Sequence, residues 1–236
     1  MLQDNNNWND DDERLVLYLD IMGFKERVSK TEITALKEIL LGFKRKNNKL
    51  KPLLYNSGGG RKRVFLKMAQ FSDSIVVISQ KATIEDLNRI TKAAVILMQT
   101  AMETGLALRG SIAAGKMIFD EPNQLFFGKA LVDAYLLEED LAFYGIVFHH
   151  TVEKLVRESL EKNDCDYYLP IEDAKLPTRR GASKHYHIAW YKMNKILSEG
   201  NITEEALSWL RILRESVSGS PRTYLDNTIE LISSSK

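Results

Sequence analysis

The sequence of 236 residues is poor in several residue types that mark specialised folds. Cys165 is the only cysteine, so there is no internal disulfide and no cysteine-rich zinc site. No apolar run approaches the ~20 residues needed to cross a bilayer, and the first residues lack the basic and apolar regions of a signal peptide. Neither sign of charge dominates, because 33 Lys and Arg stand against 32 Asp and Glu, a net charge of +1. These absences predict a cytoplasmic, soluble protein with no membrane partner, in which only local clusters of charge can attract a ligand.

The remaining composition is that of a globular protein. Hydrophobic residues make up 44% and charged residues 28% of the chain, values that exclude a mostly disordered chain, a coiled coil and a collagen-like fibre. The length suggests one domain with an elaborated end. We predict a flexible arm rich in Asn and Asp at residues 1–13, one domain at residues 14–191, and C-terminal helices at residues 192–236 that pack on the same domain.

Hydrophobic periodicity predicts the order of helices and strands. Short apolar runs are typical of buried strands, and apolar residues three and four apart are typical of helices. Predicted strands cover residues 15–19, 64–66, 75–78, 106–115, 146–148, 167–171 and 185–191. Predicted helices cover residues 31–43, 83–103, 128–139, 151–160, 203–215 and 222–233. This order predicts the α+β class, with a mixed or antiparallel sheet covered by helices.

Two aspartates carry the most informative chemical signal. Asp20 directly follows the first apolar strand, and Asp73 lies in a predicted hairpin turn at residues 71–74, just before the next apolar run. A carboxylate directly after a buried strand is costly to bury unless it is paired or bound to a cation. If the first strand lies beside the hairpin, the two carboxylates converge, and divalent cations relieve their repulsion.

Such a pair of carboxylates indicates metal-assisted chemistry. Hard oxygen ligands select Mg²⁺ or Mn²⁺, and two such ions are the usual means of attack on a phosphorus centre. Two structural alternatives stay open, namely that Asp20 is a helix N-cap and that Asp73 is a turn-forming residue.

The surroundings of these aspartates resemble the catalytic domain of class III nucleotidyl cyclases. The family's first metal motif, Phe-x-Asp-Ile-x-Gly-Phe, is similar to residues 18–24, which read YLDIMGF. Its second metal Asp lies in a β-hairpin, usually as Gly-Asp, where residues 72–73 read Ser-Asp. Its Arg-x-Gly-x-x-x-Gly strand is similar to residues 109–115, which read RGSIAAG. The resemblance spans about residues 14–150 and extends to about residue 191.

The resemblance implies a fold and a site. The fold is a class III cyclase-like sheet with a ferredoxin-like βαββαβ core and, in this chain, a C-terminal helical extension. Asp20 and Asp73 would bind two Mg²⁺ or Mn²⁺ ions, and the carbonyl of Ile21 would be an additional ligand. A homodimer is also implied, because the family's active sites lie between two such domains.

Three positions depart from the purine cyclases of this family. Those enzymes carry a base-reading Lys four residues before the second Asp, where this chain has Ala69. They also carry an Asn that orients the ribose and an Arg that stabilises charge on the transferring phosphate. These two positions fall on Val132 and Leu136, and a shift of the register by one residue restores neither. The departures argue against conventional adenylate or guanylate specificity.

Among class III cyclases, the chain looks most like the bacterial pyrimidine cyclases of Pycsar antiphage defence. These are compact homodimers that convert UTP or CTP to the cyclic monophosphate. The resemblance implies a phosphorus–oxygen lyase that uses UTP in preference to CTP. It also implies a downstream cyclic-nucleotide-gated effector that is not stably bound.

Positive charge must hold a triphosphate, because several of its oxygens gain charge in the transition state. Residues 39–72 contain many Lys and Arg and no Asp or Glu. This stretch is either a phosphate or nucleic-acid surface, or a solvated helix end and loop. Lys67 differs from the others, because it lies on the strand that leads to Asp73.

Further basic candidates lie later in the chain. Arg109, on a predicted strand, needs a partner, which is a phosphate, a base or a structural ion pair. The turn at residues 178–184 resembles the place where family members supply a Lys to the β- and γ-phosphates, and a solvated loop is the alternative there. It contains Arg179, Arg180 and Lys184. Tyr55 or Arg109 is a candidate for contact with the base.

The predicted site residues fall into two groups. The predicted catalytic residues are Asp20, Asp73, Arg109 and Lys184. The predicted nucleotide-binding residues are Ile21, Gly23, Phe24, Tyr55, Lys67, Ala69 and Arg179. The leading hypothesis is a pyrimidine cyclase. The alternatives are a purine cyclase with an unusual pocket, a degenerate cyclase-like domain that binds nucleotide without catalysis, and a nucleic-acid-binding module based on residues 44–67, although we expect no nucleic-acid partner.

Overall fold

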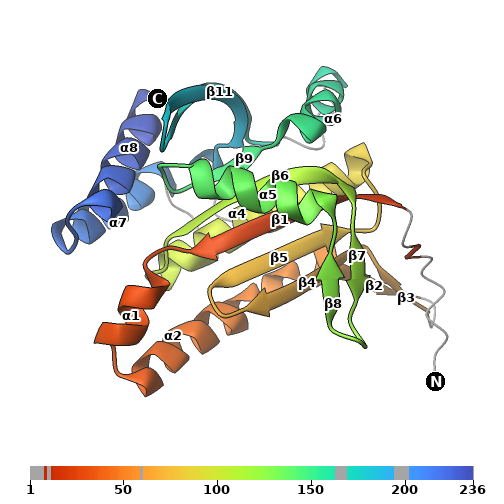
Figure 1. The fold of residues 1–236 in the computed structure, drawn as a ribbon, viewed down its shortest axis with the longest axis horizontal. Helices are drawn as coiled ribbons and strands as arrows, with labels where there is room; N and C mark the ends of the chain where they lie inside the picture. Colours follow the sequence, from red (N-terminus) through yellow and green to blue (C-terminus); the bar gives the residue numbers. More distant parts are fainter. Residues whose placement is uncertain (1–7, 10–11, 59–60, 163–168, 194–201, 236) are drawn as a thin grey trace.

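A seven-stranded sheet forms the centre of the protein, shown in Figure 1 as a computed structural model. The structure describes residues 8–9, 12–58, 61–162, 169–193 and 202–235. The strands of the large sheet are β1 (Glu13–Ile21), β4 (Leu66–Phe71), β5 (Ser74–Ser79), β6 (Leu108–Lys116), β9 (Ile146–Phe148), β10 (Ile171–Thr178) and β11 (Gly181–Ile188). Their order in space is β10-β11-β9-β6-β1-β5-β4. The β6–β9 pair is parallel and the other pairs are antiparallel, so the sheet is mixed.

Helices and two small sheets surround this centre. The small sheets pair β2 (Tyr55–Gly58) with β3 (Arg61–Val64), and β7 (Ile118–Asp120) with β8 (Leu125–Phe127). The helices are α1 (Phe24–Lys30), α2 (Ile33–Lys46), α3 (Lys51–Leu54), α4 (Ile84–Glu103), α5 (Lys129–Asp140), α6 (His150–Glu161), α7 (Ile202–Glu215) and α8 (Ser220–Ser234). Two short 3₁₀ helices are η1 (Asn47–Leu50) and η2 (Trp190–Lys192). Within the described residues, no helix has the length and apolar character needed to span a membrane.

The first half of the chain forms a ferredoxin-like βαββαβ core. Along the sequence its elements are β1, α2, β4, β5, α4 and β6, and in space the strands lie in the order β6-β1-β5-β4. This arrangement confirms the predicted α+β class and the ferredoxin-like core. It also places β1 at the centre of the sheet, directly beside the β4–β5 hairpin.

The two faces of the sheet pack against different helices. Side chains on a strand alternate between faces, so Leu15, Leu17 and Leu19 of β1 join the main apolar core with α4. Val16 and Tyr18 lie on the other face, in a smaller cluster with residues of α5 and the β7–β8 hairpin. In Figure 1, α5 crosses in front of β1 and β6 while α4 lies behind the sheet. Asp20 continues the alternation of Val16 and Tyr18 and therefore belongs to the α5 face.

Gly110 allows β1 and β6 to approach closely. A Cβ atom at this position would lie 2.3 Å from the carbonyl oxygen of Tyr18 and 2.4 Å from Cδ2 of Leu19. Both distances are too short for any side chain, so the glycine of the predicted Arg-x-Gly segment is required by packing within the sheet.

The C-terminal helices α7 and α8 correspond to the helices predicted at residues 203–215 and 222–233. The hydroxyl of Thr228 on α8 accepts a hydrogen bond from the backbone N–H of Tyr144 at 2.9 Å. The side-chain amide of Asn227 donates to the carbonyl of Ala142 at 2.8 Å. These bonds attach α8 to the segment between α5 and β9.

The structure corrects several predicted elements. The polar segment between the strands predicted at residues 167–171 and 185–191, for which no strand was predicted, is largely the edge strand β10, in which only Ile171 and Leu176 are buried. An edge strand tolerates this polarity because one side of it faces solvent. Of the strand predicted at residues 167–171, residues 167–168 lie outside the described residues, as does Cys165, and only Ile171 belongs to a strand, the first residue of β10. The β7–β8 hairpin was not predicted, because its strands have three residues each.

Candidate functional site

The two predicted metal-binding aspartates meet at one end of the sheet. Asp20 lies opposite Ser74 in the antiparallel β1–β5 pair. The backbone N–H of Ile21 donates a hydrogen bond to the carbonyl oxygen of Asp73 at 2.9 Å. The end of β1 is therefore attached to the turn that carries Asp73, which is the condition that convergence of the two carboxylates requires.

The turn itself has a conformation that favours glycine. Ser72 has a φ of 54°, in the left-handed region, and it stands where the resembling family usually has Gly. On the other side of the site, Gly23 has a φ of 71° and is the N-cap of α1. Because Gly23 occupies that place, Asp20 is not the N-cap of α1, which removes the first structural alternative. Phe24 begins α1 and packs against the main apolar core.

The surroundings of Asp20 disfavour its ionised form. Burial raises the pKa of Asp20 above its ordinary value, and the charge of Asp73 raises it further, whereas Arg109 and Lys25 oppose the shift. Carboxylates that repel each other in this way are a suitable donor set for a divalent cation. No group of three or more His, Cys, Asp and Glu in the described part of the chain is arranged to hold a metal. The pair would therefore need further ligands from phosphate oxygens and water, as Mg²⁺ commonly does.

Two more predicted residues share the face of Asp20. Lys67 and Ala69 on β4 pair with Ile78 and Val76 of β5, and these residues lie on the α5 face. Ala69 is half-buried. The Nζ atom of Lys67 lies 4.5 Å from the centre of the Trp8 ring and 5.3 Å from that of Phe119. Lys67 and Ala69 are therefore on the same surface as the carboxylates, with Lys67 farther from them along β4.

Arg109 also lies beside Asp20, in a buried ion pair. It stands opposite Asp20 in the β1–β6 register and is 3% exposed. Its Nε donates to the carboxylate of Glu138 on α5, and its Nη1 donates to the carbonyl of Leu141 at 2.8 Å. The ring of Tyr224 on α8 covers the guanidinium group, 5.7 Å from its central carbon to the ring centre. Arg109 therefore forms the structural ion pair that the sequence offered as one of its partners.

Sequence reasoning missed Glu138. The residue is 2% exposed, and it follows Ala130 and Ala134 at spacings of four on the buried face of α5. An acidic residue in line with two alanines on a helix face predicts a buried ion pair, because a buried carboxylate needs a partner.

Lys184 and Tyr55 do not meet the aspartates within this chain, whereas Arg179 reaches Tyr224, whose ring covers Arg109. Lys184 lies on β11, which β9 and β6 separate from β1 by roughly 14 Å at the usual strand spacing. Its Nζ pairs with Asp173 at 2.8 Å. Arg179, in the turn between β10 and β11, hydrogen-bonds to Tyr224, and this bond raises the pKa of its guanidinium group. Tyr55 belongs to the separate β2–β3 sheet.

The basic stretch is divided among several elements. It covers the end of α2, η1, α3, and the β2–β3 and β4 strands. Arg45 pairs with Glu38 at 3.1 Å, and Lys46 pairs with Glu103 at 2.9 Å. This arrangement agrees with a solvated helix end.

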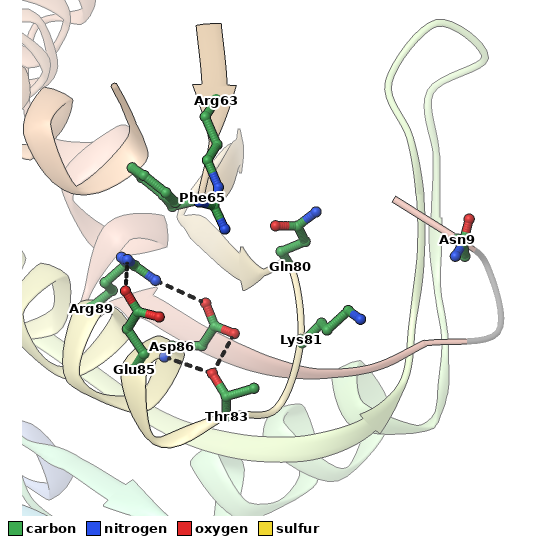
Figure 2. Close-up of a pocket in the computed structure, with 9 residues that line it drawn as sticks. All are labelled: Asn9, Arg63, Phe65, Gln80, Lys81, Thr83, Glu85, Asp86 and Arg89. Carbon is green, nitrogen blue, oxygen red and sulfur yellow. Dashed lines mark hydrogen bonds and ion pairs between the residues drawn. The ribbon is translucent and has the colours of Figure 1, made fainter. Parts of the chain in front are cut away.

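A separate hollow of about 350 Å³ lies at the other end of β5 (Figure 2). The guanidinium groups of Arg63 and Arg89 lie 5.3 Å and 4.2 Å from the centre of the Phe65 ring, and Arg89 pairs with Glu85 and Asp86. The hollow borders the residues after Ser79, and the length of β5 separates it from the aspartates by roughly 17 Å. It is therefore distinct from the carboxylate site, and its lining carries both signs of charge.

Comparison with known proteins identifies the fold. No family model matches the sequence, and no curated protein matches it. The chain is similar to the catalytic core of a rhodopsin-guanylyl cyclase with converted specificity, solved in complex with ATPαS, with a TM-score of 0.51 and 11% identity over 75% of this chain and 94% of that one. It is also similar to a bacterial light-regulated adenylyl cyclase, with a TM-score of 0.50 and 10% identity over 88% of this chain and 58% of that one. The mixed sheet and its helices thus have the fold of class III nucleotidyl cyclase catalytic domains.

Proposed function

We propose that this protein is a nucleotidyl cyclase that converts a nucleoside triphosphate to its 3′,5′-cyclic monophosphate and pyrophosphate. The observation that carries the proposal is the convergence of Asp20 and Asp73 at the junction of β1 and the β4–β5 turn, in a class III cyclase fold. Burial and, after it, the charge of Asp73 raise the pKa of Asp20, and a cation at this place would favour the ionised carboxylate.

In the proposed reaction, Asp20, Asp73 and the carbonyl of Ile21 would hold two Mg²⁺ or Mn²⁺ ions. Such ions lower the pKa of a hydroxyl and neutralise charge on transferring phosphate. The ribose 3′-oxygen loses its proton and attacks the α-phosphorus, and the bond from that phosphorus to the bridging oxygen breaks, releasing pyrophosphate. The two carboxylates must be ionised for this role, so their mutual repulsion favours metal binding.

We propose a pyrimidine substrate, with UTP preferred to CTP. Ala69 supports this proposal, because it presents no donor on the α5 face where the resembling purine cyclases have a base-reading Lys. The resemblance to the Pycsar enzymes extends the proposal to a role as second-messenger synthase in antiphage defence. The product would then act on a cyclic-nucleotide-gated effector. A purine cyclase with an unusual pocket is the alternative within the same chemistry.

A catalytically inactive nucleotide-binding domain is the second candidate function. The side chains of Val132 and Leu136 are 53% and 56% exposed on α5, at the positions where the family carries its ribose and phosphate contacts. Neither side chain can donate a hydrogen bond, so the usual transition-state contacts require replacements. This domain would bind nucleotide without releasing pyrophosphate.

We also propose that the protein acts as a homodimer through the exposed surface of helix α5. Val132, Tyr135 and Leu136 expose apolar surface on one helix, and exposed apolar clusters are typical of protein contacts. We expect Leu136→Glu to convert a dimer to a monomer in light scattering, because it places a charge in the apolar contact. Arg157→Glu, at an exposed position of α6, is the control and should leave the measured mass of the dimer unchanged. A monomeric wild-type protein contradicts this arrangement.

The direct test of the function is product identification. Purified protein is incubated with Mn²⁺ and each of ATP, GTP, CTP and UTP, and the products are identified by mass. Cyclic UMP or cyclic CMP is the expected product. Cyclic AMP or cyclic GMP retains the chemistry and contradicts the pyrimidine proposal. Nucleotide binding without any product favours the inactive domain.

A further inference from the structure

We propose that Glu138 is a positioning residue of the carboxylate site, which holds the guanidinium group of Arg109 against α5 and so prevents it from pairing with Asp20. This inference rests on the proposed function, because its consequence is the metal affinity of Asp20 and Asp73. Nothing in the sequence motifs of the site includes Glu138, which enters through the packing of α5 on the sheet.

The geometry brings three charged side chains together. Asp20 and Arg109 are direct neighbours across the β1–β6 pair. Glu138 contacts Arg109 from α5, through the hydrogen bond from Nε. Arg109 therefore has carboxylates on two sides, on β1 and on α5, and its hydrogen bonds to Glu138 and to the Leu141 carbonyl direct it towards α5.

The surroundings of Arg109 maintain this orientation. The ring of Tyr224 lies over the guanidinium group, and Tyr224 is in turn hydrogen-bonded by Arg179. Arg109 and Glu138 are 3% and 2% exposed, so water does not compete for either charge. A buried guanidinium group that loses one carboxylate must find another. Its neighbour across the strand pair is Asp20, whose ionised form Arg109 already favours electrostatically.

The charge balance gives the expected effect. With Glu138 ionised, Arg109 and Glu138 cancel, and the two aspartates keep a net charge of −2 for cations. Without the charge of Glu138, the positive charge of Arg109 offsets half of the net charge of the two aspartates. Burial raises the pKa of Glu138 to about 7, an effect that Arg109 only partly opposes. Measurements at about pH 8 therefore examine the ionised carboxylate.

The test measures Mn²⁺ binding to the full-length protein by electron paramagnetic resonance, in the absence of nucleotide and turnover. We expect Glu138→Gln to weaken Mn²⁺ binding about tenfold, because one unit of positive charge becomes available to Asp20. Arg109→Gln/Glu138→Gln removes both charges and should restore the affinity to within about threefold of wild type. The matched control is Glu139→Gln, the same change one residue along α5, and it should have no effect.

The double variant separates positioning from a merely structural role. If the ion pair only stabilises the fold, the double variant binds Mn²⁺ no better than Glu138→Gln, and the inference is wrong. Equal binding by wild type and Glu138→Gln also contradicts it. If Glu138→Gln does not fold, Glu138→Asp replaces it: this change keeps the charge but lengthens the contact, so it should weaken binding about threefold, and unchanged binding contradicts the inference. A wild-type protein that binds no Mn²⁺ overturns the proposed metal site together with this inference, whereas the variant outcomes concern the inference alone.

Discussion

The two faces of the central sheet are built from the same strands and differ in chemistry. On the α4 face, β1 presents Leu15, Leu17, Leu19 and Ile21, all at most 1% exposed within one apolar core. On the α5 face, the intervening positions change from Val16 through the half-buried Tyr18 to Asp20. Alternation along a single strand therefore separates stability from chemistry: from Leu15 to Ile21 one face is apolar, and the other becomes polar towards the end where Asp73 joins it.

The comparison also explains how charge is tolerated inside the protein. On the α4 face, apolar residues of β1 and α4 pack together in the main apolar core. The α5 face contains a buried ion pair between Arg109 and Glu138, with Tyr18 bonded to Ser74 at 2.8 Å nearby. Ion pairs of this kind add little net stability, because desolvation offsets attraction. Their presence on one face is more readily explained by the neighbouring carboxylates than by folding.

The largest expected effect comes from removing the carboxylates of the α5 face. Asp20→Ala and Asp73→Ala should each reduce pyrophosphate release at least about a thousandfold, because several kcal/mol of charge stabilisation are lost with the metal ligands. The unfolding temperature should not fall, because each change removes carboxylate repulsion. Turnover is measured with the triphosphate that the wild-type protein uses. Glu121→Ala, at an exposed turn position, is the control, and full activity in either aspartate variant contradicts the site.

The second prediction concerns a truncated side chain in the apolar core on the α4 face. Leu17→Ala should lower the free energy of unfolding by about 2–5 kcal/mol, because it leaves a cavity between β1 and α4. Urea denaturation measures the change. The control Ile33→Ala, at a side chain 70% exposed on α2, should change stability by less than about 0.5 kcal/mol. Similar losses in both variants would show that the α4 face is not the main source of stability.

The third prediction concerns the start of the helix that covers the apolar face. The hydroxyl of Thr83 accepts a hydrogen bond from the backbone N–H of Asp86 at 3.1 Å and so caps α4. Thr83→Ala should cost about 1 kcal/mol of stability. Thr83→Ser retains the hydroxyl and is the matched control. If the serine variant loses as much as the alanine variant, the cap is not the cause.

The smallest expected effect is a pH dependence of stability that comes from Asp20 on the α5 face. Because the pKa of Asp20 is raised in the folded protein, the folded state binds its proton more tightly than the unfolded state does. Its contribution to stability is present at acidic pH and is lost as the pH rises through that raised pKa. In metal-free protein, the unfolding temperature of Asp20→Asn relative to wild type should therefore increase from acidic to neutral pH. Thermal unfolding across pH measures this difference, and a difference that does not change with pH contradicts the raised pKa of Asp20.

Much of the fold could be predicted because its signals are local. Apolar runs identified β1, β5 and β9, and helical periodicity identified α2, α4, α5 and α6. Edge strand β10 was missed, since its charged residues suggest a turn until β11 pairs with it. Of the candidate site, the motif at residues 18–24 and the turn at Asp73 were predictable, because each lies within a few residues of an apolar strand.

The sequence by itself determined the alternation of β1, the small residue at position 110, the capped start of α4 and the placement of each aspartate at a strand end. Each depends on residues near in sequence. The tertiary structure alone decided which groups meet: the Ile21–Asp73 bond, the pairing of Arg109 with Glu138, and the separation of Lys184 and Tyr55 from the aspartates. The physical reason is that charges act over a few ångströms in space, and strand register and helix packing set those distances.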